Sequence, residues 1–439
     1  MTPKRRRPAA AVLLGLAIVG ATFLVHNAAS SSQAGGDSAW TTYQSLSLLR
    51  HHTLELTEWQ DVLNRFPIHW HDNDRHKPVY NFPWGTSVVS APIVGVIALG
   101  DKVGGHSLAA DIRAHFAPHH LEKAVASVWV ALTTGLVFAF AFRARRSLWV
   151  AAIVAVVFAF ATSAFSTMSR ALWNHGPAAC LVMLALLILQ AAEQDPDRHG
   201  RLIPLLGPLF VLAYAVRPTT AVGAAVLGVV VVVRQRRHPG RLLATAAAGG
   251  AALVAYAAVN LATVNSLQPG YYDPNRLGGT PTFLEGLAGN LVSPSRGLLI
   301  WSPVLLFCVL GAVIARRERR FGCLETASVV AIGLHWIVVS RLVPWWAGFS
   351  TGPRLFSDAL PFFVVLLVPA VAWLVEGGRS VPATRWLGRG AFAVLLGWSL
   401  FTNGRGATRF ETQLWNSTPV SVDLHPARNW DWHDLQFLR

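Results

Sequence analysis

Charged residues are scarce in this chain of 439 residues. They make up 13% of it, against about 25% in a typical soluble domain, and lysine stands at only four positions. The three cysteines, Cys180, Cys308 and Cys323, lie in or beside apolar runs and form no CxxC pair. These shortages exclude an ordinary soluble enzyme, a disordered protein, a disulfide-linked scaffold and a zinc site with the usual ligand spacing.

Hydrophobic residues are abundant by contrast, at 53% of the sequence. A membrane-spanning helix uses about 20 residues, so this supply suffices for about eleven spans. We expect an all-α, polytopic transmembrane helix bundle that forms a single domain over residues 1–439. A shorter apolar stretch, Val88–Leu99, is too short to cross and is expected to form an interfacial or re-entrant helix. The predicted spans are Ala9–Ala28, Ala124–Phe142, Leu148–Phe165, Pro177–Ala192, Leu202–Val216, Thr219–Val233, Leu242–Val264, Leu298–Ala315, Ala327–Ser340, Ala359–Val375 and Trp386–Phe401.

The arginines predict the orientation of these spans. The net charge of +15 is divided among short clusters between apolar runs, which argues against nucleic acid as a partner. With the N-terminus in the cytoplasm, every basic cluster falls on the inner side, as the positive-inside rule requires. The N-terminus is then inside and the C-terminus outside, with a first outer loop at about 29–123 and an outer tail at about 403–439. The first span fits a retained signal anchor, and a cleaved signal peptide is the alternative. Frequent Ala and Arg with little Lys indicate a GC-rich bacterial genome, and hence a bacterial inner membrane.

The polar motifs gather on the outer side, so we expect the active face to be extracytoplasmic. Asp37, in the motif GDSAW, follows the first span closely. A carboxylate at that position suits a general base, or a group that steadies a cation beside a lipid phosphate. The alternative is an N-cap, in which Asp37 or Ser38 starts a helix over residues 39–50.

The motif KPVYNFPWG lies in the same outer loop. Its Lys77 and Tyr80 are candidates for contact with an anionic headgroup, and its prolines fix an extended approach to the next apolar stretch. A purely structural helix start is the alternative.

Two arginines stand where outer loops enter spans: Arg296 in the motif SPSRG and Arg354 in WWAGFSTGPR. An arginine at the mouth of a membrane cavity is costly unless it is paired or faces water, and its planar guanidinium suits phosphate. Asp358 follows Arg354 by four residues, the spacing at which two side chains pair on a helix. Snorkelling to the interface is the alternative for Arg296.

The remaining candidates lie at outer ends of other spans. Arg170 and His175 flank the start of one span, and Arg217 precedes a proline between two short apolar segments. A helix-breaking turn is the alternative for Arg217. Trp345 and Trp346 belong to an excess of outer tryptophans, which suits stacking on sugar rings, although an interfacial aromatic belt is the alternative.

Histidine and aspartate are dense in the motif HWHDNDRH, residues 69–76. These side chains are common metal ligands, but their spacing here matches no defined site. We expect a solvated loop, assign no metal ligand, and leave a divalent cation open as a cofactor.

Together these features resemble the GT-C class of integral membrane glycosyltransferases, which includes protein O-mannosyltransferases, aminoarabinose transferases and mycobacterial arabinofuranosyltransferases. Asp37 falls where the class has Asp-Glu followed by aromatics, here Trp40 and Tyr43, and KPVY looks like its Lys-Pro-Pro-Leu segment. The motifs SPSRG and GPR look like outer-loop motifs of uncharacterised bacterial members. The resemblance implies a catalytic Asp37 and a polyprenyl-phosphate-linked sugar as donor. The expected substrate-binding residues are Tyr43, Lys77, Tyr80, Arg170, His175, Arg217, Arg296, Trp345, Trp346, Arg354 and Asp358.

The sequence departs from this class at the acidic pair, where Ser38 replaces the second acid. The second outer loop, at residues 167–176, carries no acid either. Catalysis of this type then rests on Asp37 alone, or it recruits one of Glu58, Asp61, Asp72 and Asp74.

The leading hypothesis is a hexosyl- or pentosyltransferase that works at the extracytoplasmic face and is embedded in membrane lipid. Its acceptor is an envelope glycan, glycolipid or protein. Arg296 and Arg354 hold the donor phosphate, and Asp37 deprotonates the acceptor hydroxyl. Two alternatives stay open. The break at Arg217 favours a lipid or solute transporter, and the missing acid favours a non-catalytic partner in cell-envelope assembly.

Overall fold

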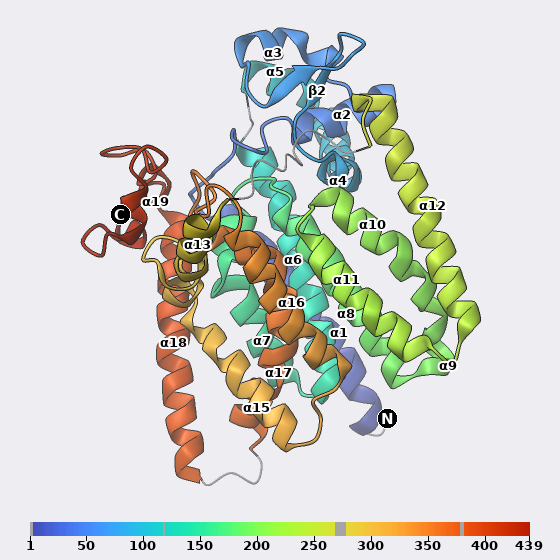
Figure 1. Ribbon diagram of the computed structural model, residues 1–439, viewed down its shortest axis with the longest axis vertical. Coiled ribbons are helices and arrows are strands. Elements are labelled where there is room, and N and C mark those ends of the chain that lie inside the picture. Colours follow the sequence, from blue (N-terminus) through green and yellow to red (C-terminus); the bar gives the residue numbers. More distant parts are fainter. Residues whose placement is uncertain (1–2, 117–118, 268–277, 378–381) are drawn as a thin grey trace.

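The computed structural model describes residues 3–116, 119–267, 278–377 and 382–439. Helices dominate these residues, and the strands among them are two short ones, so the predicted all-α fold class is confirmed. Most helices run side by side in one bundle (Figure 1). The bundle helices are α1 (Pro3–Ala28), α6 (His119–Arg145), α7 (Leu148–Phe160), α8 (His175–Gln194), α10 (Leu206–Val216), α11 (Thr220–Gln235), α12 (Pro239–Val264), α15 (Phe307–Arg317), α16 (Cys323–Ser340), α17 (Leu360–Glu376) and α18 (Pro382–Thr408).

Short elements connect these helices. The segment before α8 is a π-helical turn, η2 (Ala164–Met168), and the segment before α17 is a 3-10 helix, η7 (Arg354–Ala359). The others are α9 (Pro196–His199), η3 (Gly200–Leu205), α13 (Thr280–Val292), α14 (Leu298–Trp301), η6 (Pro303–Leu306), α19 (Glu411–Leu414), η8 (Pro426–Trp430) and η9 (Gln436–Leu438).

Eight helices within the described residues are long and apolar enough to cross a membrane, which makes the chain polytopic. Seven of them coincide with predicted spans, and the eighth is α4 (Gly85–Val103). Two further predicted spans form the shorter apolar helices α7 and α11. The predicted span Leu298–Ala315 is divided instead into α14, η6 and α15, because Ser302 precedes a proline and such a residue avoids the helical region.

The structure corrects the predicted length of the helix at Val88–Leu99. The helix there is α4, whose 19 residues are enough to cross a membrane by length. Its direction nevertheless differs from that of the bundle helices, because Figure 1 shows it nearly end-on, across one end of the bundle. Gly85 fixes its start against α10, where a side chain would meet the backbone of Ala215 at about 2.4 Å. The orientation is therefore the one expected of an interfacial helix.

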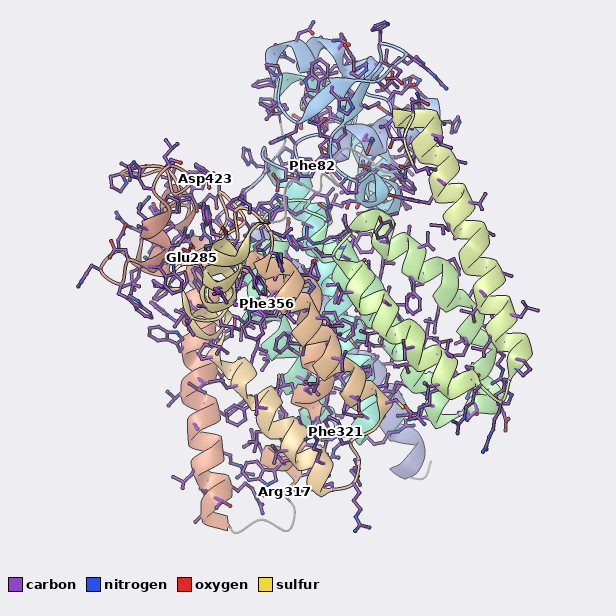
Figure 2. The ribbon with its side chains drawn as sticks, in the orientation of Figure 1. Phe82, Glu285, Arg317, Phe321, Phe356 and Asp423 are labelled. Carbon is purple, nitrogen blue, oxygen red and sulfur yellow. The ribbon has the colours of Figure 1, made fainter. Side chains whose placement is uncertain are left out.

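The two ends of the bundle differ in what they carry. The N-terminus lies at one end, called here the N-terminal end, and the outer loop and the C-terminal tail lie at the other, called the distal end (Figure 1). Figure 2 labels Arg317 and Phe321 at the N-terminal end and Phe82 and Asp423 at the distal end. The chain thus begins and ends on opposite ends, as the predicted topology requires.

The segment predicted to form the first outer loop, which keeps that name below, folds as a small helical layer on the distal end (Figure 1). Its buried cluster joins Trp40, Tyr43, Trp59 and Leu63. A two-stranded antiparallel sheet pairs Trp70 with Tyr80 and Asp72 with Pro78. The elements of this layer are α2 (Thr41–His51), η1 (Thr57–Trp59), α3 (Gln60–Arg65), β1 (Trp70–Asp72), β2 (Pro78–Tyr80), α4 and α5 (Leu108–Ala114).

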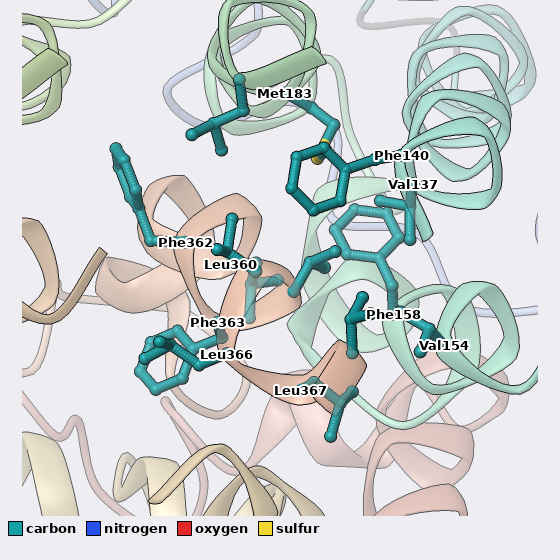
Figure 3. Close-up of a cluster of buried hydrophobic side chains, with 14 of the residues drawn as sticks. Val137, Phe140, Val154, Phe158, Met183, Leu360, Phe362, Phe363, Leu366 and Leu367 are labelled. Carbon is teal, nitrogen blue, oxygen red and sulfur yellow. The ribbon is translucent and has the colours of Figure 1, made fainter. Parts of the chain in front are cut away.

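The main core is formed by α6, α7, α8 and α17. Figure 3 shows Phe140 of α6, Phe158 of α7 and Met183 of α8 converging on Leu360 and Leu367 of α17. The helices α8 and α17 are the most buried of the eight candidate spans, whereas almost all residues of α12 are exposed or only partly buried. Exposure of that kind suits contact with lipid tails, which are as apolar as a leucine side chain.

Candidate functional site

An ion pair between Asp37 and Arg354 lies where the outer loop meets the bundle. Asp37 precedes α2, and Arg354 is the first residue of η7. The Nη2 atom of Arg354 donates to Oδ2 of Asp37, and the two side chains are 32% and 10% exposed, Asp37 being the more accessible. Burial favours the neutral acid, but the charge and hydrogen bond of Arg354 outweigh it and hold the pKa of Asp37 below its usual value. The carboxylate is therefore ionised at neutral pH and reachable from solvent.

His175 fixes the other side of the Arg354 guanidinium. Arg354 Nε donates to His175 Nε2 at 3.1 Å, and the guanidinium lies 4.0 Å from the centre of the Trp173 ring. A guanidinium has only donors, so Nε2 must accept and the ring proton must be on Nδ1. Nδ1 then donates to Asp358 Oδ1 at 2.8 Å. His175 is thus a neutral ring whose tautomer is set by its two neighbours.

The second carboxylate oxygen of Asp358 links η7 to the junction of α10 and α11. Oδ2 accepts from Arg217 Nε and from the Thr219 hydroxyl at 2.6 Å. Arg217 lies between α10 and α11, where the sequence suggested a helix-breaking turn. Its side chain pairs specifically with Asp358. We call Asp37, Arg354, His175, Asp358 and Arg217 the polar network. These residues are distant in sequence, and their side chains form one continuous series of contacts at the distal end.

The backbone around residue 354 explains why Arg354 and Asp358 do not pair with each other, as their spacing predicted. The two lie in a 3-10 helix rather than an α-helix, and its turn of about three residues separates positions four apart. Gly352 just before it has a φ of +62°, and a Cβ there would lie 2.9 Å from the Trp301 ring. This turn directs Arg354 toward Asp37 and Asp358 toward Arg217. Figure 2 labels Phe356 of the same element within the bundle.

Tyr80 also belongs to the site, through the backbone of Asp37. Its hydroxyl donates to the Asp37 carbonyl oxygen, and it lies 3.4 Å from the Thr41 hydroxyl. The predicted N-cap role of Asp37 or Ser38 is wrong, because α2 begins after Trp40 and no side chain caps it. Asp37 is therefore held by Tyr80 and Arg354 and not by a helix start.

Arg296 was expected to hold phosphate, but in the structure its guanidinium is engaged by acceptors of the protein itself. It is buried, and its guanidinium donates to the carbonyls of Trp346 at 2.9 Å and Gly348 at 3.2 Å. It also donates to Asn416 Oδ1 at 2.6 Å and Gln436 Oε1 at 2.8 Å. Burial lowers the pKa of Arg296 to about 9, which leaves it charged at neutral pH. It joins the 345–350 loop to the C-terminal tail and has no donor left for a ligand.

Arg170 and Tyr43 are likewise structural. Arg170 is fully buried, and its guanidinium donates to the carbonyls of Ala29 and Ser31 at 3.2 Å and to that of His26. It thereby joins the end of α1 to the segment before α8. Tyr43 is fully buried, and its hydroxyl donates to the Ile112 carbonyl at 2.8 Å. Both side chains are therefore engaged with the protein's own backbone, and a role for them in substrate binding stays a prediction.

Lys77, Trp345 and Trp346 also lie away from the polar network. Lys77 is 47% exposed and pairs with Glu55 at 2.8 Å across the outer loop. Trp345 is fully buried, and Trp346 donates from Nε1 to Asp423 Oδ1 at 2.7 Å. The headgroup contact predicted for Lys77 and the sugar platform predicted for the two tryptophans stay predictions, because only Trp345 is fully buried.

Sequence reasoning missed Glu122, a buried acid of α6. Its Oε2 accepts from the Ser38 hydroxyl and, at 3.2 Å, from the backbone N–H of Leu172. Ser38 follows Asp37, and Leu172 precedes the Trp173 that covers Arg354, so Glu122 holds both sides of the ion pair. The acids expected as recruits do not reach the site, since Glu58 and Asp61 pair with Arg113. A signal did exist, because Glu122 is the only acid in residues 119–145.

The histidine-rich segment forms the hairpin of β1 and β2 and packs on α12. Asn73 Nδ2 donates to the Thr263 carbonyl at 2.8 Å, and Asn265 Nδ2 donates to Asp74 Oδ2 at 2.6 Å. Within the described parts of the chain, no three His, Cys, Asp or Glu side chains are placed to share a metal ion. Asp72 is exposed at the end of β1.

No family model matches the sequence, and no curated protein matches it. Among solved structures, the protein is similar to the archaeal oligosaccharyltransferase AglB from Archaeoglobus fulgidus, in complex with an inhibitory peptide and a dolichol-phosphate. The TM-score is 0.45 at 12% sequence identity, over 98% of this chain and 60% of that chain. This protein thus spans less than two thirds of the length of that one. The polar network, and not this likeness, carries the functional conclusion.

Proposed function

We propose that this protein is a membrane glycosyltransferase of the GT-C class, formed as one transmembrane domain over residues 1–439. It moves a hexosyl or pentosyl group from a polyprenyl-phosphate donor to an envelope glycan, glycolipid or protein. The observation that carries the proposal is the Asp37–Arg354 pair. An ionised, accessible carboxylate lies beside a guanidinium that His175 orients through a hydrogen bond to Nε. Inverting sugar transfer from a phosphate donor needs one base and one phosphate-binding cation.

The two residues suit the two halves of a glycosyl transfer: Asp37 takes up a proton, and Arg354 receives the leaving phosphate. Asp37 accepts the proton of the acceptor hydroxyl as that oxygen forms a bond to the anomeric carbon of the sugar. The bond between the anomeric carbon and the phosphate oxygen breaks, and polyprenyl phosphate leaves with the electron pair. Arg354 stabilises the charge on that phosphate. Because attack and departure occur on opposite faces, the anomeric configuration inverts.

The contacts of Arg354 indicate how donor binding prepares the base. Its Nε and Nη2 atoms are engaged by His175 and Asp37, and its Nη1 atom makes no hydrogen bond with any residue that the structure describes. A donor phosphate first meets Nη1 and then competes with Asp37 for Nη2. Release of the Asp37 carboxylate is thereby coupled to the arrival of the donor, which limits proton abstraction in its absence.

The positions of the arginines support an extracytoplasmic active face. Arg317 lies at the N-terminal end, and the outer loop that carries Asp37 lies at the distal end (Figure 2). Basic loops favour the cytoplasmic side of a membrane. The distal end then faces out of the cytoplasm, in a bacterial inner membrane. A polyprenyl-linked sugar is an activated donor, so the transfer needs no nucleotide on that side.

Mass spectrometry of lipid-linked sugars and envelope glycans in a deletion strain tests this proposal. The strain is complemented with wild type, Asp37→Asn or Asp197→Asn, an exposed aspartate of α9 that serves as the matched control. We expect one glycan linkage to be lost and its donor to accumulate, with rescue by wild type and Asp197→Asn alone. Rescue by Asp37→Asn as well would contradict the role of Asp37. An unchanged glycan profile in the deletion strain would favour transport or assembly instead.

A further inference from the structure

A second candidate site lies at the N-terminal end, away from the polar network. A cavity of about 430 Å³ opens there between α7, α17 and α18. Six of its lining residues are apolar and the seventh is an arginine. They are Trp149, Ile153, Val371, Leu374, Val375, Phe392 and Arg389.

The lining residues place the cavity at the edge of the apolar part of the bundle. Trp149 is the second residue of α7, and Leu374 and Val375 belong to the last turn of α17. The end of α17 and the start of α18 lie together at the N-terminal end (Figure 1). Arg389 is seven residues into α18, about 10 Å along its axis. Arg389 is therefore close to the N-terminal end of the bundle and not at its middle.

The cavity has an apolar floor and an amphipathic rim. Val371, Leu374 and Phe392 are buried at its base, whereas Trp149 is 74% exposed. Tryptophan prefers this interfacial depth because its ring is apolar and its N–H is polar. The shape and chemistry suit a hydrocarbon chain that enters from the bilayer.

Arg389 gives the rim a charge without a counter-ion. Its Nε atom donates to the Leu374 carbonyl at 2.9 Å, and its guanidinium lies 5.0 Å from the Trp386 ring. In the described part of the chain, no acidic side chain pairs with it. A cation at this depth is costly unless an anion meets it, and its two Nη atoms are suited to a phosphate.

We propose that this cavity binds an anionic glycerophospholipid of the adjacent leaflet. One acyl chain occupies the apolar cavity, and the lipid phosphate contacts the Nη atoms of Arg389. Selection of an anionic lipid follows from the local charge, since arginines outnumber acids at this end. Glu318 and Glu376, the nearby acids, are both paired with Arg145. This inference depends on membrane embedding and not on the proposed glycosyl transfer.

Native mass spectrometry of the full-length protein tests the site. The purified protein is incubated with equal amounts of phosphatidylglycerol and phosphatidylcholine that have the same acyl chains. We expect wild type to retain phosphatidylglycerol about fivefold over phosphatidylcholine, the preference expected for one arginine near a lipid surface. Arg389→Gln should abolish the preference. Arg317→Gln, which removes an exposed arginine at the same end but outside the cavity, should preserve it.

A filling variant tests the apolar part separately. Ile153→Trp occupies the cavity without changing charge, and we expect it to lower retention of both lipids. Equal retention of the two lipids by wild type would overturn the proposal, as would a wild-type preference in Arg389→Gln. If Arg389→Gln does not fold, lipid retention by Arg389→Lys and Ile153→Trp tests the proposal instead. Normal retention by Ile153→Trp would then place the bound lipid elsewhere and overturn the proposal.

Discussion

His175 joins Arg354 to Asp358 through its two ring nitrogens, at 3.1 Å and 2.8 Å. The ring therefore transmits the position of Asp358, deep in the bundle, to the guanidinium that contacts Asp37. Because Nε2 accepts and Nδ1 donates, a protonated imidazolium would lose the hydrogen bond from Arg354. The geometry of the ion pair depends on a neutral His175.

We expect His175→Leu to reduce turnover about 100-fold, the loss expected when a catalytic group is misplaced by about 1 Å. His175→Gln should retain more activity, since its amide oxygen accepts from Arg354 while its NH₂ donates to Asp358. Donor KM and kcat measured in purified protein separate misplacement from misfolding. Equal activity of the two variants would show that the ring does not position Arg354.

Arg354→Gln is expected to shift the pH dependence of activity. Burial raises the pKa of Asp37, and Arg354 is the largest of the influences that lower it, so the variant should have a higher Asp37 pKa than wild type. If Asp37 is the base, the acidic limb of kcat/KM moves to higher pH. Profiles normalised to each variant's own maximum measure the shift. Arg409→Gln, an exposed arginine near the tail, is the control and should leave the limb in place.

The same pair predicts how stability depends on pH. A carboxyl whose folded-state pKa is depressed stabilises the fold at pH values above its unfolded-state pKa of about 3.9. That contribution is lost as the pH falls through the lower, folded-state pKa. Thermal unfolding in detergent should therefore separate wild type from Arg354→Gln at pH 7 and bring them together in acid. A constant difference across this range would mean that Arg354 stabilises the fold by packing alone.

Glu122 is expected to stabilise the site through two hydrogen bonds. Glu122→Ala leaves the Ser38 hydroxyl and the Leu172 N–H without their acceptor, at a cost of about 1–3 kcal/mol for each buried group. Glu122→Gln keeps an acceptor oxygen at the same place and should be far milder. Unfolding temperature and turnover, measured in parallel, check this order. Activity lost equally in both variants would instead show that the charge of Glu122 is needed.

Arg296→Lys should loosen the tail without a specific effect on donor binding. A lysine cannot reach the carbonyls and amides that the planar guanidinium contacts together. We expect a lower unfolding temperature and faster hydrogen exchange over residues 345–350 and 411–439. Arg409→Lys should leave both unchanged. A rise in donor KM with normal exchange would restore Arg296 as a phosphate ligand.

The sequence predicted the helices well because membrane burial leaves a local signal. Long apolar runs such as Leu242–Val264 read as helices wherever they occur, and α12 covers that run. The failures came where a proline or a short turn changes the local geometry, as at Ser302 and in η7. The extent of α4 was underestimated because polar residues continue its helix beyond the apolar stretch.

The site was only partly predictable because the outer arginines look alike in sequence. Arg170, Arg296 and Arg354 all precede or enter apolar segments, and each has the same chemistry. Their roles differ in the acceptors that distant segments bring to them: backbone carbonyls for Arg170, amides and carbonyls for Arg296, and the Asp37 carboxylate for Arg354. Tertiary packing alone decides which guanidinium keeps a free donor.

The Asp37–Arg354 contact joins positions 317 residues apart. This separation also fixes the interval between the synthesis of the two residues. Ribosomes add about 5–20 residues per second, so roughly 15–60 seconds pass between synthesis of the carboxylate and synthesis of its partner. For that interval Asp37 has no Arg354 guanidinium to lower its pKa. A nascent chain or a truncated product that stops before η7 therefore carries Asp37 without its partner. Synthesis of η7, and not of α2, is therefore the step that completes the ion pair.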